Sequence, residues 1–346
     1  MNIPKRAMVL AGGGPAVGLS MGALKRIGEE ADIQFDVWSC ACIGAWVGIL
    51  WNQAPKGEEY AATDAFMRQV FRPDAYYDRF PMATVFAPNW MDYISAATTF
   101  AADPRSYNNL VVPEMIAEAL QDLARFAASP SEWNMGNLNT VIFNDLIAPN
   151  PMARFFSSMM YKSALQGLAQ IYYPNSRLLN QIDFGALYGD EKPYIYHNAY
   201  NLSGQRLELF SNKRDDKYQN ISDASLCACS ALPYIEAPVE IDNNIYCEGA
   251  TVDTVNFEHL LGNHPDLDEI WVSRILDTKQ VRRPDNLLDA LNNLVMLFAA
   301  SVSEDDVTLF IQDVEKKKAE GKVKKSLKVL QLEVDHNIYY DWTYSN

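Results

Sequence analysis

Two apolar segments near the amino terminus each lead into a tight turn and then into a helix. Residues 7–11 form an apolar run that ends at the glycines of residues 12–14, which is typical of a buried strand followed by a sharp turn. Residues 18–30 then carry apolar side chains at helical spacing. The same order follows at once, with a strand predicted at 35–39 and an apolar helix at 43–51. Two such units in succession predict a mostly parallel sheet between helices.

Alternating apolar and polar positions predict two hairpins in the second half of the chain. The first joins residues 194–200 to 206–210 through Asn201-Leu-Ser-Gly204, and the second spans residues 239–247. A helix of small residues, 222–232, lies between them and ends at Pro233. Further elements are expected after the hairpins: strands at 269–276 and 327–334, with helices at about 285–320.

Residues 55–190 have a mainly helical pattern that proline and asparagine interrupt. We expect them to form a helical insertion or cap in a single α/β domain of residues 1–346. Methionine and aromatic side chains in this region suit an acyl-chain groove, although such residues more often simply form core, and both interpretations stay open. They are Met82, Phe86, Trp90, Met91, Tyr93, Phe155, Phe156, Met159, Met160, Tyr161, Tyr172 and Tyr173.

The charge and hydropathy of the chain limit the kinds of molecule that it is expected to bind. The chain has 29 basic and 44 acidic residues, a net charge of −15, which disfavours nucleic acid and anionic bilayers. No stretch approaches the ~18 apolar residues of a membrane-spanning helix, and the apolar run after Lys5 and Arg6 is too short for a signal peptide. We therefore expect a soluble, cytoplasmic protein with no transmembrane segment. A lipid substrate would have to be reached through apolar surface or be delivered by a carrier.

Five cysteines raise the question of a metal or disulfide site. They occupy positions 40, 42, 227, 229 and 247, and the four histidines lie elsewhere in the sequence. Zinc sites more often separate paired cysteines by two to four residues, and an odd number of thiols in a reducing compartment disfavours a disulfide framework. We predict no metal and no cofactor, with most of these thiols packed in the core.

Cys42 falls where a catalytic nucleophile is expected. A side chain on the sharp turn between a strand and a helix is exposed at the carboxyl edge of the sheet, near the positive end of the helix dipole. Residues two positions away on either side must be small; Gly44 meets this requirement and Cys40 meets it approximately, while Ile43 completes the turn. Ser39 is a rival nucleophile, but no glycine stands two residues from it.

The glycines at 12, 13 and 14 suit an oxyanion hole. Glycine lets the backbone turn sharply and lets a ligand oxygen approach the N–H groups, each of which is typically worth ~2.7 to 4 kcal/mol in the transition state. The alternative is a phosphate-binding loop. A Gly-Lys-Ser/Thr ending or a Gly-x-Gly-x-x-Gly fingerprint would be expected there, and neither follows.

Several segments together resemble the patatin-like phospholipase family. The matching stretches cover roughly residues 7–55 and 193–276, in the order and spacing of that family. They are Leu10-Ala-Gly-Gly-Gly14, Cys40-Ala-Cys-Ile-Gly-Ala45, Ala228-Cys-Ser-Ala-Leu-Pro233, Pro238-Val-Glu-Ile-Asp242 and Tyr246-Cys-Glu-Gly-Ala250. The resemblance implies a three-layer α/β fold, with an architecture similar to that of malonyl-carrier transacylases.

The resemblance also implies a two-residue catalytic centre, and here the sequence departs from the family. Cys42 stands where the family has serine, and Glu248, followed by Gly249 and Ala250, stands where it has aspartate. We expect Cys42 to attack an acyl ester or thioester, with Glu248 as base and then acid. Acyltransferase, thioesterase and lipid acyl hydrolase activities all fit. The alternative is a catalytically degenerate module that binds a lipid or a protein partner.

Overall fold

A computed structural model describes residues 3–30, 33–70, 87–173, 176–213, 217–257, 259–285 and 287–332. Contacts divide the chain into two units, one of residues 1–88 with 167–346 and one of residues 89–166. Two residues of the predicted acyl-chain groove, Met82 and Phe86, lie outside the described ranges. So does the end of the predicted strand, residues 333–334.

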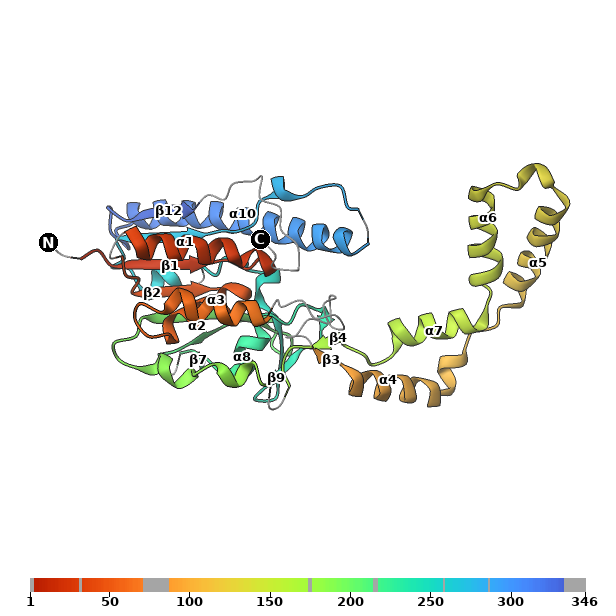
Figure 1. The fold of residues 1–346 in the computed structure, drawn as a ribbon, viewed down its shortest axis with the longest axis horizontal. Coiled ribbons are helices and arrows are strands. Elements are labelled where there is room, and N and C mark those ends of the chain that lie inside the picture. Colours follow the sequence, from red (N-terminus) through yellow and green to blue (C-terminus); the bar gives the residue numbers. More distant parts are fainter. Residues whose placement is uncertain are drawn as a thin grey trace. The chain divides into compact units, whose positions relative to one another are not determined.

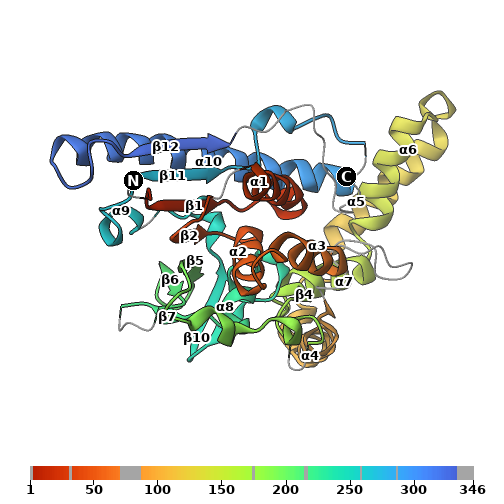
Figure 2. The same cartoon turned by 60° about the vertical axis from the view of Figure 1, so that its left-hand side comes forward.

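The first unit is built on one large sheet. Its central strands follow one another in the order β12, β11, β1, β2 and β5, which runs from top to bottom in Figure 2. These strands are parallel neighbours, and β5 continues into antiparallel pairs with β6 and β10. The bounds are β1 Arg6–Leu10, β2 Val37–Cys40, β5 Tyr194–Asn201, β6 Arg206–Ser211, β7 Gln219–Asn220, β9 Val239–Ile241, β10 Asn244–Glu248, β11 Glu269–Ser273 and β12 Lys328–Leu332.

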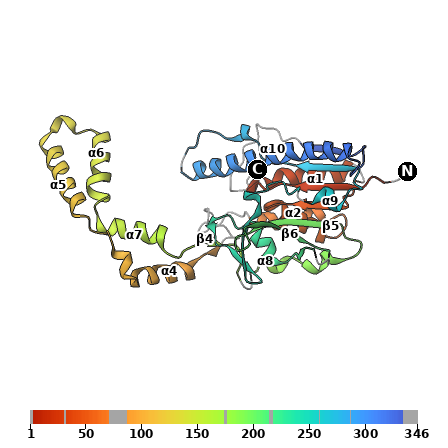
Figure 3. The same cartoon turned by 180° about the vertical axis from the view of Figure 1, so that it is seen from behind.

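Helices cover both faces of this sheet because its central strands are apolar on both sides. In β1, Met8 and Leu10 belong to one buried cluster and Ala7 and Val9 to another, as alternation along a strand requires. The first cluster includes side chains of α1 Val17–Glu30, α2 Ile43–Gln53 and α3 Glu59–Val70, which face the viewer in Figure 1. The second includes side chains of α9 Leu260–Asn263, seen from behind in Figure 3, and of the carboxyl-terminal half of α10 Leu287–Ala319. The predicted class, a mostly parallel sheet between helical layers, is confirmed.

Both predicted hairpins are present. β5 pairs antiparallel with β6, and β9 with β10, at the turn positions that the sequence indicated. The small-residue helix is shorter than expected: α8 spans Asp223–Ala228 and begins at a capping box of Ser222 and Ser225. A second, three-stranded sheet in the order β3-β4-β8 is formed by Ala87–Pro88, Gly167–Gln170 and Tyr234–Glu236.

The second unit is helical. It contains α4 Trp90–Ala102, α5 Pro113–Ala128, α6 Met135–Val141 and α7 Pro151–Lys162. Phe155 of α7 contacts Phe100 and Tyr107, with ring centroids 5.6 Å apart in each pair. This unit is narrower than the predicted insertion of residues 55–190, because α3 packs with α1 and α2 and because β4 pairs with β8 in the first unit.

Candidate active site

Cys42 lies on the turn between β2 and α2 and precedes the first residue of the helix. Its backbone has φ 49° and ψ −128°, a strained conformation for a residue other than glycine, and such strain is typical of a nucleophile on a strand-to-helix turn. The turn leaves no room for a side chain at Gly44, where an added Cβ would lie 2.5 Å from the carbonyl oxygen of Leu10. The close approach of β1 to α2 therefore accounts for the glycine two residues after the thiol.

Cys40, on the other side of the turn, is fully buried at the end of β2. The space beside its sulfur is made by Gly48 of α2, where an added Cβ would lie 2.7 Å from Cys40 Sγ. A small residue is expected at position 40, and cysteine is accommodated there because the facing helix has a glycine beside the sulfur.

The glycine loop after β1 faces the same turn. An added Cβ at Gly12 would lie 3.0 Å from Cys42 Cβ, and one at Gly13 would lie 2.7 Å from the side chain of Ile275. The N–H of Gly12 donates to the carbonyl oxygen of Thr254 at 3.0 Å, so it is already used. Within the described part of the chain, the N–H groups of Gly13 and Gly14 donate to no backbone carbonyl. These two donors are therefore available to a ligand.

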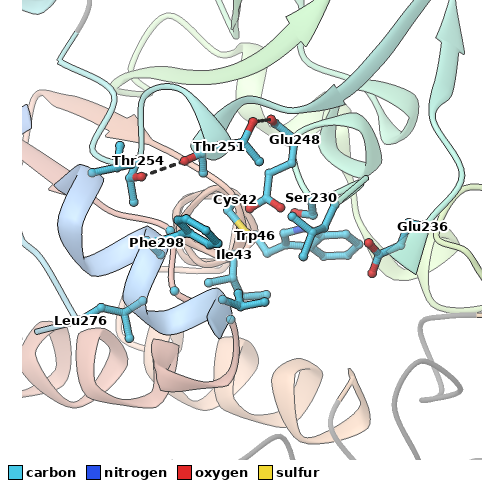
Figure 4. A pocket seen from close by; sticks show the side chains of 18 of the residues that line it. Cys42, Ile43, Trp46, Ser230, Glu236, Glu248, Thr251, Thr254, Leu276 and Phe298 are labelled. Carbon is cyan, nitrogen blue, oxygen red and sulfur yellow. Dashed lines mark hydrogen bonds between the residues drawn. The ribbon is translucent and has the colours of Figure 1, made fainter. Parts of the chain in front are cut away.

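Glu248 ends β10 and points at Cys42, as Figure 4 shows. Its N–H donates to the carbonyl oxygen of Ala231 at 2.9 Å, and its own carbonyl oxygen accepts from Thr251 Oγ1 at 2.8 Å. Gly249 follows in a tight place, since an added Cβ would lie 2.8 Å from Asn198 Oδ1. The carboxyl group is therefore held by a fixed backbone, and the residue is only 8% exposed.

Burial controls the electrostatics of the pair. It raises the pKa of Glu248 to about 7, against a lowering effect of the hydrogen bond with Cys42. Burial, followed by the charge of Glu248 and the same hydrogen bond, raises the pKa of the Cys42 thiol well above its usual value. The hydrogen bond from the backbone of Ile43 opposes this shift but is a smaller effect. The free site therefore holds a neutral thiol beside a carboxyl group that titrates near neutral pH.

A cavity of about 360 Å³ opens beside the pair, within the size range of small-molecule sites. Most of its wall is apolar, and Cys42, Glu248 and the three glycines lie along it. The other lining residues are Ile43, Trp46, Val70, Ile171, Ser230, Leu232, Glu236, Ala250, Thr251, Thr254, Leu276, Val295, Phe298, Ala299 and Val302. Of the positions singled out in the sequence, Cys40, Gly44 and Gly249 shape the site from behind and do not line the cavity in the described structure.

Much of the apolar wall comes from residues that the sequence analysis did not assign to it. The aromatic and methionine residues suggested for an acyl groove are absent from the lining in the described part of the chain. Four residues of α10 take that place: Val295, Phe298, Ala299 and Val302. Glu236 was also missed, and a carboxylate three residues after Pro233 on a short apolar strand was the available signal.

Fold and site together define an α/β protein with a thiol on a strand-to-helix turn and a carboxyl group from a distant strand at one cavity. Residues 8–261 match the model of the patatin-like phospholipase family, which is most of the chain. The protein belongs to this family, whose members are generally lipid acyl hydrolases. Among the described residues, no helix combines the length and apolar character needed to cross a bilayer.

The chain also resembles solved structures, at low sequence identity. The chain is similar to the crystal structure of VipD from Legionella pneumophila, at 14% sequence identity and a TM-score of 0.33. The match covers 71% of this chain and 46% of the VipD chain, so it spans less than half of that protein's length. No curated protein matches the sequence significantly.

Proposed function

We propose that this protein is an acyl-transfer enzyme in which Cys42 attacks the carbonyl carbon of an acyl ester or thioester. The observation that carries the proposal is that the Cys42 thiol and the Glu248 carboxyl face each other at the wall of one apolar cavity. The free N–H groups of Gly13 and Gly14 supply donors for the oxyanion. An acyl chain fits against the apolar side chains of α10.

Glu248 is the base in this mechanism. An ordinary carboxylate has a pKa of ~4.3 and accepts a thiol proton poorly, whereas a pKa of about 7 makes Glu248 a much stronger base. Because the resting thiol is neutral, the proton moves to Glu248 as sulfur attacks, not before. The C–S bond forms, the bond to the leaving group breaks, and Glu248 returns the proton to the leaving group. Water, an amine, an alcohol or a carrier thiol then attacks the acyl-cysteine and gives its proton to Glu248. The C–S bond breaks, and Glu248 returns the proton to the Cys42 sulfur.

Cysteine favours transfer and thioester substrates over plain lipid hydrolysis. A thioester on Cys42 is more readily attacked by amines and thiols than the oxyester of a serine homologue. Delivery of the acyl group by a carrier and a cytoplasmic location are part of this proposal and rest on the sequence.

A second candidate is a module that binds acyl groups without turnover. What favours it is the burial of the Cys42 thiol, which raises its pKa well above the usual value and so disfavours the reactive thiolate. In that case the cavity would bind lipid, and the cysteine would be a packed side chain.

Turnover of acyl thioesters and p-nitrophenyl esters separates these candidates. We expect the wild type to turn over both, Cys42→Ala to turn over neither, and Cys42→Ser to lose most activity on thioesters. Added amine or thiol acceptors should divert product from hydrolysis to transfer. Full thioester turnover by Cys42→Ser would refute thiol-specific chemistry, and absence of turnover in the wild type would favour the binding module.

A further inference from the structure

A second carboxyl group, Glu236, lines the same cavity and has no role in the mechanism above. It is the last residue of β8, only 3% exposed, and its register is fixed by pairing with Ala169 of β4. The strands leave little freedom there, because an added Cβ at Gly167 would lie 2.3 Å from the carbonyl carbon of Glu236. The side chain is therefore held at the cavity wall by a rigid backbone.

Glu236 lacks a partner for one of its oxygens. Oε2 is buried and accepts no hydrogen bond from any described residue. Buried polar atoms in proteins are nearly always paired, so this oxygen can accept a hydrogen bond from a ligand that enters the cavity. The lining in the described part of the chain contains no Lys, Arg or His that would supply a positive charge.

We propose that Glu236 is a specificity residue that binds a primary ammonium group on the acyl substrate. The inference rests on the proposed function in taking this cavity as the acyl-substrate site. Trp46 lines the same cavity as Cys42 and Glu236, as Figure 4 shows, and an aromatic ring attracts a cation. The ammonium group would thus lie beside Glu236 and Trp46.

The charges at the site favour a cation over other polar groups. Burial, and then the charge of Glu248, raise the pKa of Glu236 well above its usual range, so the site favours its neutral form. An ammonium group supplies the charge that allows Glu236 to ionise, whereas a carboxylate or phosphate would add a third acidic group to the cavity. A hydroxyl group would make a hydrogen bond to Glu236 but would supply no charge. Hydrogen bonds between charged groups are stronger than those between neutral groups.

Calorimetry with three six-carbon ligands tests this assignment without turnover. At pH 8 we expect hexylammonium to bind the wild type roughly tenfold more tightly than hexan-1-ol, with hexanoate the weakest. Glu236→Gln should remove the preference for hexylammonium. The control Glu240→Gln makes the same substitution at an exposed position on β9 and should keep the preference, which separates the local effect from attraction to the net charge of −15.

Equal or tighter binding of hexan-1-ol or hexanoate by the wild type would overturn the assignment, even if the Glu236 variant does not fold. An unchanged preference in a folded Glu236→Gln variant would also overturn it. Because binding is measured without reaction, the two proposals can be refuted independently. Ammonium selectivity in a protein that never turns over acyl esters would refute only the catalytic proposal. Turnover of acyl esters without ammonium selectivity would refute only the role of Glu236.

Discussion

Glu248 has the burial of a core residue and the position of a catalytic base. Only 8% of it is exposed, and the main effect of that burial is to disfavour its charged form, which brings its pKa to about 7. This makes the group a stronger base and, at the same time, places its titration in the range of ordinary assays. Two measurable consequences follow for one residue, one in rate and one in stability.

The first consequence concerns the pH dependence of turnover. Glu248 must be ionised to accept the thiol proton, so kcat/KM should be low below pH 6 and rise to a plateau above pH 8, with a midpoint near 7. Glu248→Gln should lower kcat by about 10²–10⁴-fold and abolish this rise. A midpoint near 4.5, or an unchanged profile in the variant, would show that another group is the base.

The second consequence concerns folding. A carboxyl whose pKa rises from 4.5 in the unfolded chain to about 7 in the folded protein binds its proton more tightly when folded. Its contribution therefore favours folding at acid pH and is lost as pH rises from 4.5 to 7, by up to ~3 kcal/mol. Glu248→Gln should unfold at a higher temperature than the wild type at pH 8, measured by circular dichroism, with a smaller difference at pH 5. A less stable variant at pH 8 would contradict the burial argument.

At the scale of elements, the turn at Cys42 is held by two neighbouring segments. The N–H of Ala41 donates to the Leu10 carbonyl oxygen at 3.0 Å, which fixes the turn to β1. The side chain of Asn256 donates to the Cys40 carbonyl oxygen at 2.9 Å, which fixes it to the loop after Glu248. The conformation of Cys42 is therefore set by contacts far apart in sequence, as local strain at a functional residue requires.

Packing between Cys40 and Gly48 gives a test of this arrangement. Gly48→Ala should destabilise the protein by ~1–3 kcal/mol in denaturant unfolding, because the added Cβ meets Cys40 Sγ at 2.7 Å. The double variant Cys40→Ala with Gly48→Ala should recover most of that loss. Gly22→Ala in α1 is the control, since nothing lies within 4 Å of its added Cβ. Equal losses of stability in Gly48→Ala and Gly22→Ala would contradict the close packing of Cys40 Sγ against Gly48.

The sequence predicted the local elements of the site better than its walls. The strand, turn and helix around Cys42 follow from residues close together in the chain, so apolar pattern and glycine placement reveal them. The cavity side chains of α10 could not be identified in this way. The sequence of a helix shows that it has an apolar face but not what that face packs against. The N–H of Gly12 was likewise expected in the oxyanion hole, but its bond to the Thr254 carbonyl depends on a loop some 240 residues later.

Across the whole molecule, the site joins parts of the sequence that are far apart. The first two strands supply the glycines and the thiol, β8 and β10 supply two carboxyl groups, and α10 supplies apolar wall. α10 also fixes the loop after Glu248, because Asp306 accepts a hydrogen bond from the N–H of Thr254 at 2.9 Å. One long helix therefore contributes both to the cavity wall and to the position of the loop after Glu248.

A large side chain introduced into the cavity from α10 should reduce activity on long acyl chains more than on short ones. Ala299→Trp places a large side chain in the cavity, so kcat/KM should fall at least tenfold for dodecanoyl esters and much less for acetyl esters. Thr308→Trp, at an exposed position of the same helix, should leave both unchanged. Equal losses for the two chain lengths would show that α10 does not bind the acyl chain.

The most direct measurement is intact mass after rapid acid quench of the protein with an acyl p-nitrophenyl ester, followed by peptide mapping. The wild type should gain the mass of one acyl group on the peptide that contains Cys42, and Cys42→Ala should gain none. An acyl group on another residue, or the absence of any adduct at all quench times, would contradict the covalent role of Cys42.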